Sequence, residues 1–396
     1  MDWKFLEFIK SGKLLFIASV AVNFAVYFLG NVVPRMQNPM IGGPIDFYSV
    51  FMKTAEIFIE RPANIYFDTD HTLYRNLPAH MLYLVIFHYI GGQHALNLFS
   101  HSLIIFYVNL GSCYLISSIC QLECMQERAT ILIKRPFFLM AAYMLLLMHG
   151  LEYLFGHSHA QAGFFALVGI YYYLQGRKHL AVMSWSIAAI FKLNPLLWVF
   201  FFIWERPWKK LMKNMIYAAI PQLPSMIMFL TWPKLITDFF NSNVHFSTEW
   251  APLVYPVSGT ISREFSYLFS TDIVPFAIAT LFMVAPFTIY ILYKFNLDKM
   301  DKLMIVALST IAILPDFTTA HIFYIAGLFL TWSSVRSSLI SNREKISLSI
   351  TLGIPTLATT PWFYFPFISP FYVIPLGYIL IKVLKQSRES MVAEPS

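Results

Sequence analysis

One acidic residue near the start of the chain has the surroundings expected of a catalytic base. Asp46 follows Gly42, Gly43 and Pro44, soon after the first long apolar run. Proline and glycines favour a fixed turn there, which would hold the carboxylate at a membrane boundary. Such a carboxylate could remove a proton from a hydroxyl group. It could also cap a helix expected over 48–60, and the two roles are compatible.

Two further acids in the same region compete for the role of base. Asp68 and Asp70 form an Asp-x-Asp pair around Thr69, and Arg75 follows between Tyr74 and Asn76. The sequence therefore leaves open which of these three carboxylates accepts the proton.

Lys192 is the most informative cation, because it lies in the middle of an apolar stretch over 180–204. Pro195 removes a helix hydrogen bond and disfavours helical geometry at Asn194, so two half-helices are predicted to meet beside this lysine. A lysine at membrane depth costs about 2.5–3.5 kcal/mol on insertion scales and usually faces a polar cavity or an anionic partner. The alternative is that Lys192 snorkels to a lipid headgroup.

The amino-acid composition is that of an integral membrane protein, so membrane helices must position these groups. Of the 396 residues, 58% are hydrophobic and 12% charged, against about 25% charged in soluble domains. Apolar runs recur along the whole chain, so we expect one all-α domain over 1–396, a polytopic bundle of about twelve transmembrane segments. The expected segments are 14–33, 95–119, 137–155, 161–175, 179–191, 195–204, 215–231, 273–294, 302–314, 319–335, 346–360 and 370–384, of which 179–191 and 195–204 are two short broken helices.

The distribution of lysine and arginine sets the expected topology. Residues 77–90 are kept on the outer surface as a re-entrant or interfacial helix, because the inner loops then hold most of the basic residues. Both termini become cytoplasmic, and large external loops cover about 34–92 and 232–272. The net charge of +7 is then ordinary positive-inside charge, with no sign of nucleic-acid binding.

The first external loop resembles that of GT-C glycosyltransferases, which use polyprenyl-phosphate sugars. The matching features are Asp46-Phe47-Tyr48, then Tyr66, then the run 74–78. The likeness is greatest to two branches: the first mannosyltransferase of GPI biosynthesis, and the bacterial and archaeal polyprenol-phosphate-mannose enzymes of glycosyltransferase family 87. Many relatives carry a second acid two residues after the first, where this chain has Tyr48.

Three later stretches resemble parts of the same family in the same order. Residues 156–161 are similar to a Gly-rich loop before the fourth span, and 191–195 resemble a lysine-x-x-proline junction. Residues 316–321 resemble a late loop whose histidine precedes an aromatic-rich span. His157 and His159 stand where relatives often carry Gln or Arg and Asn, which affects the expected substrate more than the reaction type.

The resemblance implies transfer of a sugar, with mannose favoured, from a polyprenyl-phosphate or dolichyl-phosphate donor to a glycolipid or glycan acceptor. The reaction would occur on the extracytoplasmic or ER-luminal face, with inversion and with Asp46 as base. Lys192, with His321 and Arg263 as further candidates, would face the donor phosphate. The remaining substrate contacts implied are Arg75, His157, His159, Gln161, Asp68 and Asp70.

No cofactor or metal is expected, because a lipid-phosphate donor lacks the diphosphate that usually requires a divalent cation. His157 and His159, spaced by two, suit a metal poorly in a helix but adequately in an extended loop. The expected partners are the lipid-linked donor, the acceptor and membrane lipids. The acceptor, the oligomeric state and the choice between plasma membrane and ER stay open.

Two other functions are compatible with the composition. A secondary transporter, or a carrier of lipid-linked sugars without catalysis, would also combine a broken helix with a midplane charge. That reading predicts a second interruption in a related half, whereas the sequence contains one interruption, at Asn194-Pro195, and no visible repeat. A structural subunit of a membrane complex would have no convergent polar cavity.

Overall fold

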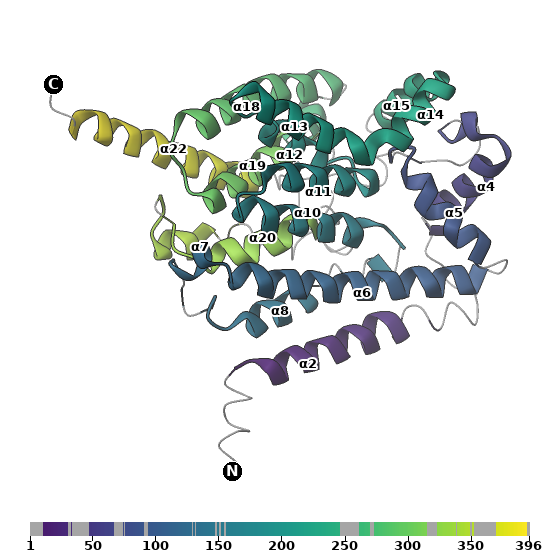
Figure 1. The fold of residues 1–396 in the computed structure, drawn as a ribbon, viewed down its shortest axis with the longest axis horizontal. Coiled ribbons are helices and arrows are strands. Elements are labelled where there is room, and N and C mark those ends of the chain that lie inside the picture. Colours follow the sequence, from purple (N-terminus) through teal and green to yellow (C-terminus); the bar gives the residue numbers. More distant parts are fainter. Residues whose placement is uncertain are drawn as a thin grey trace, which may run out of the picture. The chain divides into compact units, whose positions relative to one another are not determined.

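The computed structural model describes most of the chain as helices (Figure 1). The described residues are 11–30, 33, 47–66, 74, 76–90, 94–128, 130, 132–146, 149, 152–153, 156–245, 261–269, 273–314, 323–337, 339–348, 351 and 370–393. The regular elements in these ranges are all helical, so the predicted all-α class is confirmed. Contacts divide the chain into two units: 1–126, 131–243 and 323–327 form the first, and 127–130, 244–322 and 328–396 form the second. That the whole chain is one domain stays a prediction.

The first unit contains most of the described helices. They are α2 (Lys13–Val22), the π-helical η1 (Asn23–Leu29) and η2 (Phe47–Met52), α4 (Lys53–Glu60), the short η3 (Pro62–Asn64), α5 (His80–Ile90), α6 (His94–Cys120), α7 (Glu123–Gln126), α8 (Pro136–Met144), α10 (His159–Leu174), α11 (Lys178–Phe191), α12 (Pro195–Phe202), α13 (Trp208–Ala219), η4 (Ile220–Gln222), α14 (Leu223–Thr231) and α15 (Lys234–His245).

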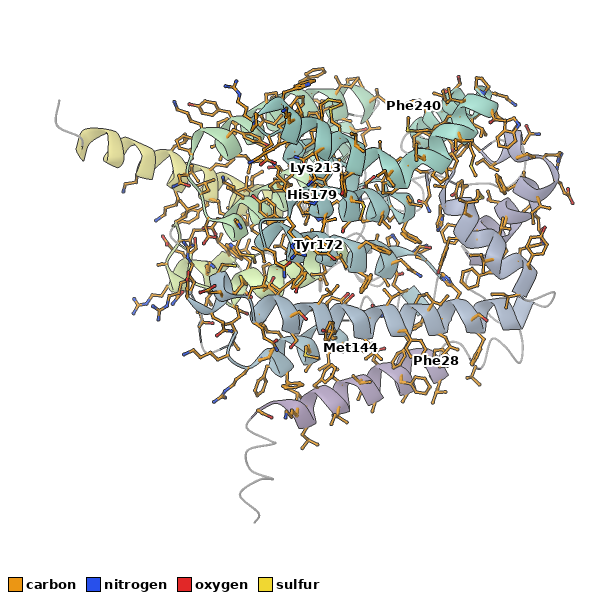
Figure 2. The ribbon with its side chains drawn as sticks, in the orientation of Figure 1. Phe28, Met144, Tyr172, His179, Lys213 and Phe240 are labelled. Atoms are coloured by element: carbon orange, nitrogen blue, oxygen red, sulfur yellow. The ribbon has the colours of Figure 1, made fainter. Side chains whose placement is uncertain are left out.

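Successive helices of the first unit pack side by side: α2 lies against α8, α8 against α6, α6 against α10, and α10 against α11 (Figure 1). Asn23 fixes the first contact by donating from Nδ2 to the carbonyl oxygen of Met144, at 3.1 Å. On the other side, His179 of α11 and Lys213 of α13 lie close together, and both contact the ring of Tyr217 (Figure 2). The apolar interior of this unit therefore forms between helices that are neighbours in space, and these are not always neighbours in sequence.

The closest helix packing in the first unit joins α10 to α11. Trp185 of α11 is fully buried, and its indole Nε1 donates to the carbonyl oxygen of Ala166 on α10, at 3.2 Å. Gly169 faces the same indole, because a Cβ at that position would lie 2.8 Å from Trp185 Cε2 and closer still to Nε1. The missing side chain of Gly169 is thus what lets the two helices approach.

The second unit contains α17 (Ile261–Phe269), α18 (Ile273–Lys294), α19 (Lys299–Ile313), α22 (Pro370–Ala393) and the end of α20 (Phe323–Ser333). Helix α18 packs against α17 and α19, and α19 packs against α22. Buried Lys345 donates from Nζ to the carbonyl oxygens of Trp332, at 2.9 Å, and Val335, at 2.7 Å. The Trp332 indole in turn donates to Asp301, at 2.9 Å.

This buried lysine makes the stability of the second unit depend on pH. Burial lowers the pKa of Lys345 to about 8 from 10.5, so between these values the unfolded chain binds the proton and the folded chain does not. Stability should therefore rise with pH through that window, by about 3 kcal/mol in total. We expect the melting temperature of the wild type, relative to that of Lys345→Met, to rise between pH 7.5 and 10. If the melting temperatures of the two proteins changed with pH in parallel, this prediction would be contradicted.

Fewer helices are long enough to cross a membrane than the sequence predicts. In the described residues, Phe99–Cys120 within α6 and Ile273–Lys294 are long and apolar enough. A third span is possible if Trp208–Thr231 and Lys234–Asn243, bent by 111°, are one broken segment. The described part of the chain therefore holds two or three candidate spans, whereas about twelve were expected over the whole chain.

Most expected segments coincide with a described helix, and several were already short in the expectation. Helices α10, α11 and α12, of 16, 14 and 8 residues, are close to the expected 161–175, 179–191 and 195–204, whereas α8, of 9 residues, ends well before the expected 155. At about 1.5 Å per residue these helices are shorter than a hydrocarbon core of about 30 Å. The segment 77–90, expected not to cross, is the 11-residue helix α5, which is also too short to cross alone.

Candidate functional site

Three stretches that are far apart in sequence meet in the first unit and bring buried polar side chains together. They are residues 74–83 at the start of α5, the loop 156–158 that enters α10, and the end of α11. Parts of all three contain predicted site residues. Their convergence follows from the packing of α10 against both α6 and α11, and of α5 against α6.

His80 is the centre of the first hydrogen-bonded group and is fully buried. Its Nδ1 accepts from the Asn76 amide at 3.0 Å, and its Nε2 lies 3.1 Å from the Ser158 hydroxyl oxygen. Because Nδ1 accepts, Nε2 carries the proton and donates it to Ser158. The Tyr74 hydroxyl is 3.2 Å from the same Nδ1, and the rings of Tyr74 and Tyr83 each stack with the imidazole. This group ties the loop before α5 to the loop before α10.

A second group ties α6 to the same loop through His101. Its Nε2 lies 3.0 Å from the carbonyl oxygen of Gly156 and 3.3 Å from that of His157. Carbonyls only accept, so His101 donates from Nε2, and its Nδ1 accepts from the Tyr83 hydroxyl at 3.0 Å. Gln161 donates from Nε2 to Tyr83 at 2.8 Å. The predicted site residue Gln161 is therefore part of a directed chain of hydrogen bonds that ends on the loop backbone.

Glu152 is the buried acid of the site. Its Oε2 accepts from the backbone amide of His159, at 3.1 Å, and from that of Ala160, at 3.4 Å, so the carboxylate caps the N-terminus of α10. Its Oε1 lies 2.5 Å from Nδ1 of His159. This contact needs one proton between the two atoms, and Nδ1 of His159 carries it when the carboxylate is ionised.

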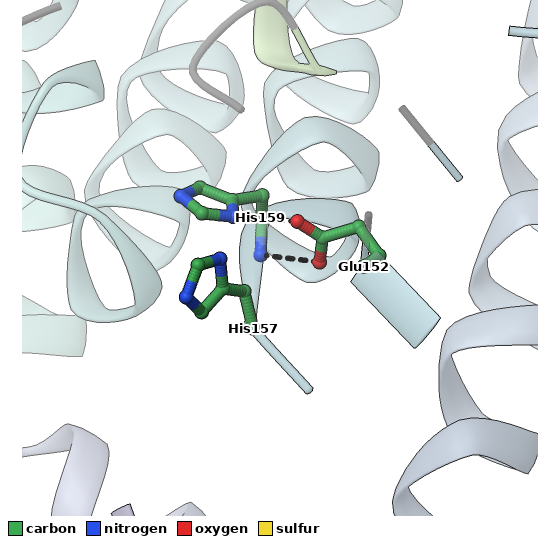
Figure 3. A group of neighbouring side chains, drawn as sticks. All are labelled: Glu152, His157 and His159. Atoms are coloured by element: carbon green, nitrogen blue, oxygen red, sulfur yellow. Dashed lines mark hydrogen bonds and ion pairs between the residues drawn. The ribbon is translucent and has the colours of Figure 1, made fainter. Parts of the chain in front are cut away.

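The predicted residues His157 and His159 form one cluster with Glu152 (Figure 3). The ring centroids of the two histidines are 4.7 Å apart and their planes are inclined at 79°. His159 and Glu152 are buried, whereas His157 is half-buried. Two imidazoles and a carboxylate can move protons or bind a divalent cation.

Lys192 lies at the predicted interruption, which is confirmed: α11 ends at Phe191, Lys192 has extended backbone geometry, and α12 begins at Pro195. The Phe191 ring lies 5.7 Å from that of His80 and 5.2 Å from that of Tyr83. The Lys192 ammonium interacts electrostatically with both Glu152 and His80. The predicted pairing of Lys192 with Asp46 lies outside the described residues, and the described carboxylate on which the Lys192 charge acts is Glu152.

The other predicted site residues are not placed in this cluster. Asp46, Asp68, Asp70, Arg75 and His321 lie outside the described residues, and Arg263 belongs to α17 of the second unit, with its side chain outside the description. The helix η2 begins one residue after Asp46. Within it, the Phe51 ring lies 5.5 Å from the His80 ring and 6.3 Å from the His157 ring. The segment that follows Asp46 therefore reaches the cluster.

Glu152, His80 and His101 are not among the site residues predicted from the sequence. Each of them interrupts an apolar stretch with a polar side chain, and that is the signal that could have drawn attention to them. Comparison of the chain with known protein families, with curated proteins and with solved structures found no match. The family resemblance therefore depends on the motif residues themselves, and its functional content is a proposal.

Proposed function

We propose that this protein transfers a sugar, with mannose favoured, from a polyprenyl-phosphate donor to a hydroxyl group of a glycolipid or glycan. The observation that supports this is the convergence of three motif segments, around His80, the loop 156–161 and Lys192, on one buried polar cluster. A purely structural membrane subunit has no need of such a cluster, because buried polar groups are costly unless fully paired.

The donor carries its own activation, since the departing group is a lipid phosphate. The protein has to orient the acceptor, remove its proton and stabilise the charge on the departing phosphate. In this proposal Asp46 is the base: it takes the proton of the acceptor hydroxyl, whose oxygen attacks the anomeric carbon from the face opposite the phosphate, so that the C–O bond to the lipid phosphate breaks with inversion. Lys192, held at the break between α11 and α12, faces the phosphate. The helices belong to a GT-C-like membrane bundle with the site on the extracytoplasmic or luminal side.

The hydrogen-bonded groups around His80 and His101 have a supporting part in this proposal. They fix Gly156 and Ser158 on either side of His157, and so hold the loop at the start of α10 in one arrangement. Preorganised loops of this kind reduce the entropy lost when a flexible substrate is positioned. In this proposal half-buried His157, on that loop, contacts the sugar.

The direct test is transfer of labelled sugar by the purified full-length protein in lipid vesicles. The vesicles would contain radiolabelled polyprenyl-phosphate mannose and a mixture of membrane glycolipids. We expect label to move from the lipid phosphate to a new product with time. Movement of intact donor between leaflets, without a new product, would instead support a carrier. If neither a new product nor movement of the donor were found, both functions would be contradicted.

Lys192→Ala is expected to weaken use of the donor. A hydrogen bond to a charged group contributes about 1.5–3 kcal/mol, which corresponds to roughly 10- to 100-fold in the apparent donor KM. Initial rates at varied donor concentration measure this effect. Lys210→Ala is the matched control, since Lys210 is an exposed lysine on α13. An unchanged donor KM in Lys192→Ala would instead support the alternative that this lysine contacts a lipid headgroup.

A further inference from the structure

We propose that Glu152, His157 and His159 form a binding site for Zn²⁺ at the start of α10. The sequence predicts no metal, because two histidines alone are a weak signal. The structure adds a carboxylate to them: one ligand atom from each residue lies within 4.8 Å of the other two (Figure 3). Two histidines and one glutamate are the protein ligands of a known class of zinc sites, which keep a fourth position open.

Glu152 and the backbone that carries the two histidines are anchored before any ion arrives. Glu152 is held by the two backbone amides at the start of α10 through Oε2, which leaves Oε1 directed at His159. Gly156, between Glu152 and the histidines, has φ of 67°, a left-handed conformation that glycine adopts without strain. This turn brings the carboxylate back against His159.

The loop that carries the histidines is fixed from two other helices. His101 of α6 donates to the carbonyl oxygen of Gly156, and His80 of α5 donates to the hydroxyl of Ser158. These contacts hold the residues next to His157 and His159, so the ion would not have to order a flexible loop. A rigid preformed site loses less entropy on binding.

The distances require a small adjustment around the ion. Zinc bonds to nitrogen and oxygen are about 2.0–2.2 Å, so two ligands of one ion are at most about 4.2 Å apart. The 4.8 Å limit of this cluster is wider, and a side-chain rotation of half-buried His157 can close it. When the ion binds, Oε1 of Glu152 would coordinate it and give up its hydrogen bond with the His159 ring. Oε2 would continue to accept from the backbone amides at the start of α10.

The charge around the cluster gives the proposal a specific signature. The carboxylate attracts a cation, but the Lys192 ammonium acts electrostatically on that same carboxylate. Removing the ammonium should therefore strengthen zinc binding, in the opposite direction to the loss expected when a ligand is removed. Among divalent ions, Zn²⁺ should bind more tightly than Mn²⁺ at a site with two imidazoles.

The test is zinc content and affinity of the purified full-length protein in detergent. The protein is stripped with a chelator, incubated with ZnCl₂ and desalted, and the retained zinc is measured by mass spectrometry. We expect about one zinc per chain, with affinity reduced at least about 10-fold in His157→Asn and in Glu152→Gln, and increased in Lys192→Ala. The control is His88→Asn, a histidine of α5 outside the cluster.

Each outcome decides the proposal. No stoichiometric zinc in the wild type, or wild-type affinity in His157→Asn, would overturn it. Because Glu152 also caps α10, Glu152→Gln could fail to fold, and the half-buried His157 then carries the test alone. Size-exclusion chromatography without zinc checks that the variants are folded. Zinc content is measured without any sugar substrate, so this result and the transfer assay can fail independently.

Discussion

Asp46→Asn is expected to reduce sugar transfer by about 10²- to 10⁴-fold, the usual contribution of a positioned general base. The amide has nearly the same shape as the carboxylate and can still cap a helix, but it cannot accept the acceptor's proton at neutral pH. The measurement is the initial rate of labelled product formation by wild type and variant in the same vesicles. Donor KM should change little, because the phosphate contact is assigned to Lys192.

Asp68→Asn and Asp70→Asn are the matched controls for this experiment. If Asp46 is the base, each of them should keep most of the transfer rate. Equal rates for Asp46→Asn and wild type, with a large loss in one of the other two, would assign the base to that residue. The contact of Phe51 with the rings of His80 and His157 favours Asp46, because it brings the segment just after Asp46 to the polar cluster.

Gly169→Ala is expected to destabilise the first unit, although alanine normally favours a helix over glycine. The added methyl group would overlap the Trp185 indole and disturb its hydrogen bond to the Ala166 carbonyl oxygen. Trp185 is fully buried and cannot move away without shifting α11. Overpacking of this kind costs about 1–3 kcal/mol. Thermal unfolding followed by tryptophan fluorescence should show a lower melting temperature.

Gly377→Ala provides the comparison for this prediction. Gly377 also lies within a helix, α22, but a Cβ built there meets nothing within 4 Å. The substitution should therefore be neutral or stabilising, by up to about 1 kcal/mol, from helix propensity alone. If both variants melt at the same temperature as the wild type, the close approach of α10 and α11 at Gly169 is wrong. Because Lys192 follows α11 directly, a displaced α11 would also reduce donor use.

Local sequence signals were sufficient to place most helices. The interruption beside Lys192 could be predicted because Pro195 has no N–H to continue the hydrogen bonds of α11. The expectation of non-helical geometry at Asn194 was wrong: Asn194 keeps helical geometry, and the extended residue is Lys192. The helix over 95–119 agrees with α6 at His94–Cys120, and 273–294 agrees with α18. Hydropathy did not predict how many helices are long enough to cross, since it averages over short breaks that end a helix.

The chemistry at the start of α10 was only half visible in the sequence. His157 and His159 were selected because they lie close together along the chain, but Glu152 acquires its role by folding back over Gly156. His80 and His101 come from two other helices, and only the packing of α5, α6 and α10 makes them partners of one loop.

The sequence by itself determined that this is an apolar, all-helical protein, where its helices lie along the chain and where one of them breaks at a lysine. These properties depend on residues within a few positions of one another. Only the tertiary structure decided that the carboxylate beside the two histidines is Glu152. The physical reason is that burial forces each polar side chain to find a partner, and which partner lies within reach depends on how distant helices pack.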